Sequence, residues 1–198
     1  MGRIIGRRYR FVDDYKKTVY VGANGKPKQK IRYIGQWVCP QNEQGEFSRI
    51  VLMSRIAAGA ALAAVIAALL AVPLPMDNRW YVPLTAAAFF PLIYAVMGVA
   101  LMPNQAKPME RQRFHKSFER AKGAAIACLI VLGLAVIAAI VCWILVFCGV
   151  IVEIKAFTFR DGAYAFCMLL SAAANIALIL ENRKLKTELK ENDAYKPE

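Results

Sequence analysis

The sequence predicts an all-α integral membrane protein: four transmembrane helices with a small cytoplasmic N-terminal β-meander. Three observations lead to this fold class. Four stretches contain no Asp, Glu, Lys or Arg, and each approaches or exceeds the roughly 20 residues that a helix needs to cross a bilayer. The basic residues lie in alternate connecting segments, and the first fifty residues have the composition of strands and turns. The uncharged stretches are residues 56–76, 80–106, 123–152 and 162–180.

Residues 1–47 are expected to form the β-meander and a linker. Three runs rich in Tyr, Val, Ile, Phe and Trp occur at residues 8–12, 18–22 and 30–38. The Asn24-Gly25 pair between the second and third runs favours a hairpin, because a type I′ turn needs positive φ at both central positions. So small a sheet is marginally stable alone, and we expect another surface to cover its apolar face.

The four-helix transmembrane domain is expected over residues 48–191, followed by a frayed cytoplasmic tail at residues 192–198. A basic cytoplasmic loop is expected at residues 103–122. The predicted spans cover about residues 56–75, 81–102, 123–149 and 162–181.

Several local features refine this plan. Pro91 removes a backbone hydrogen bond inside the second span and is expected to kink it. The segment 108–122 predicts an amphipathic helix whose aromatic side, with Phe114 and Phe118, rests at the membrane boundary. Leu185 and Leu189 are four residues apart, so the fourth helix is expected to continue beyond the membrane.

The distribution of Lys and Arg predicts the orientation, because basic residues are retained on the cytoplasmic side. Of the 26 Lys and Arg residues, 23 precede the first span, occupy the middle loop or follow the last span. Both termini are therefore expected in the cytoplasm and the protein in the cytoplasmic (plasma) membrane. The long polar lead-in does not resemble a cleavable secretory signal, so the first span is expected to remain as an anchor.

The first span is rich in alanine and is expected to be a centre of helix packing. Lipid gives helices little hydrophobic reason to associate, so close approach through small side chains takes that role. Four small residues recur at four-residue spacing and are the predicted packing face: Gly59, Ala63, Ala67 and Ala71.

The fourth span carries the clearest polar candidates for an interhelical contact or a solute path. Cys167, Ser171 and Asn175 are spaced by four residues and fall on one face of a helix. An unpartnered amide is costly in hydrocarbon, so Asn175 is expected to face the bundle, with Thr85 and Tyr94 of the second span as partners. A structural hydrogen bond is the favoured reading, and a polar stripe along a solute path is the alternative.

The basic loop predicts contact with anionic lipid headgroups on the cytoplasmic side. A protein partner is the second reading, and no nucleic-acid binding is expected, because retention of cations already accounts for the charge. The predicted lipid-contacting residues are Arg111, Arg113, Lys116, Arg120 and Lys122.

Groups that carry out chemistry are scarce, so no catalytic, cofactor or metal site is predicted. His115 is the single histidine, and the five cysteines contain no C-x-x-C pair. Neither a phosphate-binding loop nor a nucleophile-elbow motif occurs.

Three functions follow from these observations. The first is a non-catalytic accessory, assembly or interaction subunit that associates with its own copies or with another membrane complex. The alternative is a small oligomeric transporter or channel for a neutral or small solute, because no intramembrane carboxylate is expected for proton coupling. The third and least favoured is a membrane-embedded enzyme that uses Asp13, Asp14 or His115.

Overall fold

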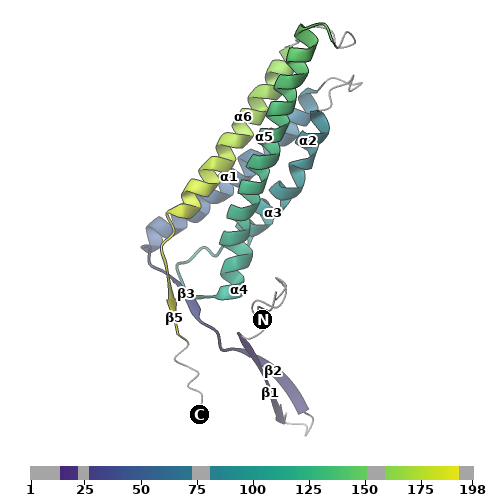
Figure 1. The fold of residues 1–198 in the computed structure, drawn as a ribbon. Helices are drawn as coiled ribbons and strands as arrows, with labels where there is room; N and C mark the ends of the chain where they lie inside the picture. Colours follow the sequence, from purple (N-terminus) through teal and green to yellow (C-terminus); the bar gives the residue numbers. More distant parts are fainter. Residues whose placement is uncertain (1–13, 22–26, 73–80, 151–158, 192–198) are drawn as a thin grey trace, which may run out of the picture.

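The computed structural model describes residues 14–21, 27–72, 81–150 and 159–191, which form a bundle of long helices with two small sheets at one end (Figure 1). Four helical segments in these ranges are long and apolar enough to cross a membrane, by length and composition. They are Gln44–Ala71, Val82–Ala100, Arg111–Phe147 and Phe159–Arg183. The predominance of helix and the four candidate spans agree with the prediction.

The most extensive packing in the bundle is between α1 (Gln44–Ala71) and α6 (Phe159–Arg183). Small residues of α1 are buried where it contacts its neighbours, which lets the helix backbones approach closely. These residues are Ala57, Ala58, Ala61, Ala64 and Ala68. The first span is therefore a packing centre, as expected, although Ala71 alone of the four predicted residues packs against the chain's own core.

The second span is divided into α2 (Val82–Ala87) and α3 (Phe89–Ala100), with Ala88 between them. Pro91 has no N–H to offer to the carbonyl of Ala87, four residues earlier, and the helix is interrupted at that turn. The Ala88 N–H contacts both the Leu84 and Thr85 carbonyl oxygens, at 3.3 and 3.1 Å. The predicted effect of Pro91 therefore appears as an interruption of the helix at Ala88.

The third span begins well outside the uncharged stretch. It comprises α4 (Arg111–Phe114), a π-helical turn (His115–Glu119) and α5 (Arg120–Phe147) in one continuous helix. Gly98 of α3 packs on the π-helical turn so closely that a Cβ would lie 2.8 Å from the Ala121 nitrogen and 2.9 Å from the Ser117 oxygen. The π-helical turn and a glycine together allow this close approach of two spans.

The amphipathic helix expected at the membrane boundary packs differently. Phe118 is buried, Phe114 is half-buried, and the Phe118 ring lies 6.1 Å from the Phe47 ring of α1, centroid to centroid. The prediction that this aromatic side rests at the membrane boundary was wrong for Phe118, because the first turns of α1 cover its ring.

The strands form two sheets in place of one meander. β1 (Tyr15–Val21) and β2 (Pro27–Tyr33) make an antiparallel hairpin. β3 (Trp37–Pro40) is the centre of a second antiparallel sheet, between β4 (Met109–Glu110) and β5 (Thr187–Lys190). The predicted strand 30–38 is thus split between two sheets, and the expected run 8–12 lies outside the described residues.

The second sheet joins three segments that are far apart in the sequence. Val38 pairs with Met109 on one side and with Leu189 on the other. The prediction that α6 continues as a helix through Leu189 was wrong. The helix ends at Arg183, and the chain then forms β5, an edge strand that pairs with β3. The sheet therefore connects the lead-in, the middle loop and the tail at one end of the bundle (Figure 1).

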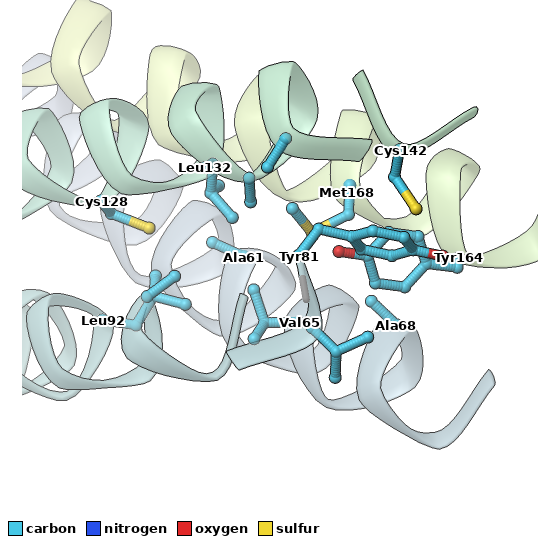
Figure 2. Packing of buried hydrophobic residues seen from close by; sticks show 14 residues of the cluster. Ala61, Val65, Ala68, Tyr81, Leu92, Cys128, Leu132, Cys142, Tyr164 and Met168 are labelled. Atoms are coloured by element: carbon cyan, nitrogen blue, oxygen red, sulfur yellow. The ribbon is translucent and has the colours of Figure 1, made fainter. Parts of the chain in front are cut away.

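Two clusters of buried side chains fill the molecule. The distal cluster lies in the half of the bundle away from the sheets and includes Val65, Leu92, Leu132 and Met168 (Figure 2). The proximal cluster includes Phe47, Val99 and Leu178, and it also holds Val38 of β3 and Met109 of β4. The second sheet is consequently packed onto the bundle by the same apolar core.

Candidate functional site

The inner face of α6 carries most of the buried polar side chains of the candidate spans. Seven residues at alternating spacings of three and four are all buried, which is the period of a helix seam. Five of the seven are polar, and only Met168 and Leu178 are apolar. This α6 polar face consists of Asp161, Tyr164, Met168, Ser171, Asn175, Leu178 and Asn182.

The middle of the α6 polar face is tied to its own helix and to two neighbouring helices. Ser171 donates from its hydroxyl to the Ala61 carbonyl oxygen of α1 at 3.1 Å. Asn175 donates through Nδ2 to the Ser171 carbonyl oxygen at 2.9 Å and contacts Cys128 Sγ of α5 at 3.5 Å. Asn175 is fully buried and faces the bundle as expected.

The distal end of the face contains a cluster of hydroxyl and carboxyl groups. Tyr164 and Thr85 of α2 share a hydrogen bond between their hydroxyls. The Tyr81 ring lies 5.3 Å from the Tyr164 ring, centroid to centroid, and Figure 2 shows the two rings close together beside Cys142. Asp161, one turn before Tyr164, is 4% exposed. A carboxyl group is thus buried at the distal end of the bundle.

Several atoms of the face have no hydrogen-bond partner among the described residues. They are Asn175 Oδ1 and both side-chain polar atoms of Asn182, together with Ser54 Oγ on α1. Buried polar atoms in native proteins are nearly always bonded to protein or to ordered water. These atoms therefore mark positions where water, or another polar group, is expected inside the bundle.

The residues predicted as partners of Asn175 do not contact it in the structure. Thr85 is fully buried, but it contacts Tyr164 and not Asn175. Tyr94 is 57% exposed and points away from the bundle. Cys167 is half-buried beside the polar face. The pairing of Thr85 and Tyr94 with Asn175 was wrong because the rotation of the second span about its axis depends on tertiary packing.

The sequence-based prediction of the face did not include Asp161, Tyr164 and Asn182. Residues at four-residue spacing shift gradually around a helix, so this spacing predicted Cys167 and passed over Tyr164. Alternating steps of three and four from Ser171 would have reached all three missed residues. That spacing was the available signal.

The predicted packing face of α1 lies on the outside of the single chain. Gly59, Ala63 and Ala67 are exposed, Ala71 is half-buried, and no atom lies within 4 Å of a Cβ built on Gly59. Ala71 packs against the distal cluster, whereas Gly59, Ala63 and Ala67 lie on the outer surface of α1. Larger exposed side chains, Ile56, Ile66 and Leu70, accompany them there.

The predicted lipid-contacting residues gather at the sheet end of the bundle. Arg113, Lys116 and Lys122 are exposed, whereas Arg111 and Arg120 are half-buried. The Arg111 backbone N–H donates to the Tyr33 hydroxyl at 3.1 Å, which fixes the start of α4 against the hairpin. Of the five, Arg111 thus lies where the hairpin meets the bundle.

Chemical groups that could hold a metal do not cluster in the described ranges. They contain no group of three or more His, Cys, Asp or Glu side chains that could hold an ion. All five cysteines are free, and the His115 Nδ1 atom contacts the Glu119 carboxylate on its own helix. Comparisons of the chain with protein-family models, curated proteins and solved structures find no match. The site must therefore be interpreted from its own geometry.

Proposed function

We propose that this chain is a non-catalytic multi-pass membrane protein that acts as an accessory, assembly or interaction subunit in the cytoplasmic (plasma) membrane. The observation that supports this most directly is the bonding of the polar residues inside the bundle. Ser171 and Asn175 use their donors on the Ala61 carbonyl, their own helix and Cys128. Such contacts stabilise a membrane bundle, and they leave the outer surfaces for association.

The proposed association surface is the outward small-residue face of α1, with Gly59, Ala63 and Ala67. In lipid, helices associate through close backbone approach at small side chains, and these residues already lie exposed on one side of the bundle. The partner is a second copy of the chain or another membrane protein with a comparable helix. The excess of Lys and Arg in the lead-in, the middle loop and the tail supports an orientation with both termini and the second sheet in the cytoplasm.

Cross-linking in native membranes tests this function. We expect a tagged full-length chain to yield a stoichiometric cross-linked complex, and Ala63→Leu to reduce its yield about fivefold because the larger side chain separates the helices. Ala127→Leu is the matched control, since Ala127 is an exposed alanine on the outer face of α5. Wild-type yield in Ala63→Leu, or equal losses in both variants, would remove the proposed surface.

A small oligomeric transporter or channel is the second candidate, and the buried polar atoms of α6 and α1 that have no partner among the described residues favour it. Asn175 Oδ1, Ser54 Oγ and the Asn182 amide could contact water or a neutral solute. Reconstitution into proteoliposomes distinguishes the two functions. Flux of water or a small neutral solute that is lost in Asn175→Leu would favour transport, and flux equal to that of empty vesicles would favour the subunit.

A further inference from the structure

A cationic cleft opens at the sheet end of the bundle, where α1, the end of α3 and the start of α4 meet. Its volume is about 630 Å³, within the range of about 300–1,000 Å³ that ligand sites occupy. Three cationic side chains from three different segments line it, and none of its lining residues is acidic. The lining includes Arg55, Lys107, Arg113, Met102, Asn104 and Gln105.

The floor of the cleft is held in place by side chains of α1. Arg55 donates from Nη2 to the Met102 carbonyl oxygen at 2.9 Å. Gln44 donates to the Asn104 carbonyl oxygen at 3.2 Å and accepts from the Ala106 N–H at 2.8 Å. Ser48 also donates to the Asn104 carbonyl oxygen, at 3.3 Å. The loop that carries Lys107 is therefore ordered before any ligand binds, which lowers the entropic cost of binding.

The acid nearest to the cleft in sequence, Glu110, is not among the residues that line it. Glu110 lines a neighbouring cleft of about 360 Å³ and accepts a hydrogen bond from the Tyr15 hydroxyl at 2.8 Å. In the part of the chain that the structure covers, neither Lys107 nor Arg113 has a carboxylate ion-pair partner. Three positive charges held close together with no acid among them favour an anion that carries several oxygen acceptors.

An apolar stripe leads from this region along the outside of α3. Phe90, Tyr94, Met97 and Leu101 are all exposed and follow one another at spacings of four, three and four residues. Leu101 lines the neighbouring cleft, which shares Ala100, Met102 and Arg113 with the cationic one. Arg55 immediately precedes the uncharged stretch of α1, so the cleft lies at the level where the apolar spans begin.

We propose that this cleft binds the phosphate headgroup of an anionic phospholipid, whose acyl chain lies along the α3 stripe. The guanidinium groups of Arg55 and Arg113 and the Lys107 ammonium contact the phosphate oxygens, while Met97 and Leu101 contact the chain. The site goes beyond the general attraction of basic loops to a charged leaflet, since it singles out three cations and one apolar surface. It requires the chain to span a bilayer, and it is independent of whether the chain is a subunit or a transporter.

Binding of a short-chain anionic glycerophospholipid to the full-length chain in zwitterionic micelles tests the proposal. We expect saturable binding that weakens about fivefold to tenfold in Arg113→Gln and in Lys107→Gln, as for loss of one cation near a lipid headgroup. Arg113 and Lys107 are chosen because their side chains make no hydrogen bond that holds the loop, unlike Arg55. Arg49→Gln is the matched control, because Arg49 is an exposed cation of α1 outside the cleft, and it should change the affinity less than twofold.

Two further arms identify the source of the phosphate. Inorganic phosphate at millimolar concentration should not displace the lipid, and Leu101→Ser should weaken lipid binding about threefold because part of the acyl contact is lost. Equal weakening in Arg49→Gln would show that only general attraction operates and would overturn the site. Unchanged binding in both Arg113→Gln and Lys107→Gln would overturn it as well, and displacement by inorganic phosphate would overturn the lipid as its ligand. The cross-linking experiment on α1 is unaffected by any of these results, so failure of one proposal does not imply failure of the other.

Discussion

Asn175 shows how a single polar residue can serve structure in a membrane bundle. Its Nδ2 has two acceptors nearby, but its Oδ1 has no partner among the described residues. Interhelical side-chain hydrogen bonds in membranes contribute on average about 0.6 kcal/mol. Replacement by an apolar residue of similar size removes these bonds and also the unpaired oxygen.

We therefore expect Asn175→Leu to fold, with a change in the free energy of unfolding within about 1 kcal/mol. Thermal unfolding in detergent micelles measures this, with Ser171→Ala as a companion because that change leaves no new unpaired side-chain atom. A fall in stability well beyond this range would show that the amide is bonded to buried water or to a polar group not yet identified.

Adding a single methyl group at Gly98 is expected to destabilise the folded protein strongly. A Cβ at this position would lie 2.8 Å from the backbone nitrogen of Ala121, and backbone cannot move aside as a flexible side chain can. We expect Gly98→Ala to lower the free energy of unfolding by about 1–3 kcal/mol, the usual cost of overpacking. Gly133→Ala on α5 is the control, since nothing lies within 4 Å of its Cβ. That variant should be neutral or stabilised by up to about 1 kcal/mol through helix propensity, and equal effects of the two variants would contradict the close contact.

At the scale of elements, Asn42 attaches the tail to the lead-in. Its Nδ2 donates to the Lys184 carbonyl oxygen at 3.2 Å, and its Oδ1 accepts from the Lys186 N–H at 2.8 Å. Asn42 is buried, and these bonds fix the turn between α6 and β5. The edge strand β5 is itself fully exposed, so it depends on this turn and on β3.

We expect Asn42→Ala to accelerate tryptic cleavage after Arg183 and Lys184 about tenfold, which corresponds to the roughly 1–2 kcal/mol of two lost side-chain bonds. Gln41→Ala is the matched control, because Gln41 contacts Glu188 through an exposed side chain and should change cleavage little. Similar cleavage of both variants would mean that the main-chain pairing of β3 with β5 alone holds the tail.

The hairpin contacts the middle loop through Tyr15, whose hydroxyl donates to Glu110 Oε2 at 2.8 Å. Burial, the hydrogen bond to Glu110 and the negative charge of that residue raise the pKa of the Tyr15 hydroxyl above its usual value of about 10. The folded state therefore binds more protons than the unfolded state above that pH. The stabilisation is fully present below about pH 10 and is lost as the pH rises through the raised pKa.

Alkaline titration followed by tyrosinate absorbance tests this contact. The difference between wild type and Tyr15→Phe should contain one tyrosine that titrates later than its usual pKa. In Glu110→Gln that same tyrosine should titrate earlier than in wild type, since burial remains but the negative charge is gone. A Tyr15 that titrates near its usual value in wild type would show that the hairpin is not held on the middle loop in solution.

The success of prediction differed between helices and strands for a physical reason. Lipid excludes ions so strongly that four candidate spans can be read from composition alone. β3, in contrast, pairs with Glu110 and Leu189, and no local pattern encodes partners so distant in the chain. The burial of Asn175 was predictable from its cost in hydrocarbon. The partner of Thr85 was not, because it depends on the rotation of one helix against another.

For the whole molecule, the second sheet explains how the charged segments are organised. It joins the lead-in, the middle loop and the tail, and these three segments hold 23 of the 26 Lys and Arg residues of the chain. In the proposed topology, four crossings bring all three segments to one side of the membrane, and the strands of the second sheet pair them with one another. The sheet end of the bundle is therefore the end that we place in the cytoplasm.

Cysteine labelling tests that orientation without adding a domain to the chain. Cys148 is exposed just beyond α5 at the distal end, whereas Cys39 is buried in the second sheet. A membrane-impermeant maleimide added to intact cells should label Cys148, and Cys148→Ser should abolish the signal, because Cys128 and Cys142 are buried in the bundle and Cys167 is half-buried.

A cysteine placed at exposed Thr187 of β5 in the Cys148→Ser background should react only after the cells are made permeable. Labelling of that position from outside, with Cys148 protected, would reverse the orientation and move the cationic cleft to the outer leaflet, which carries fewer anionic lipids to bind there.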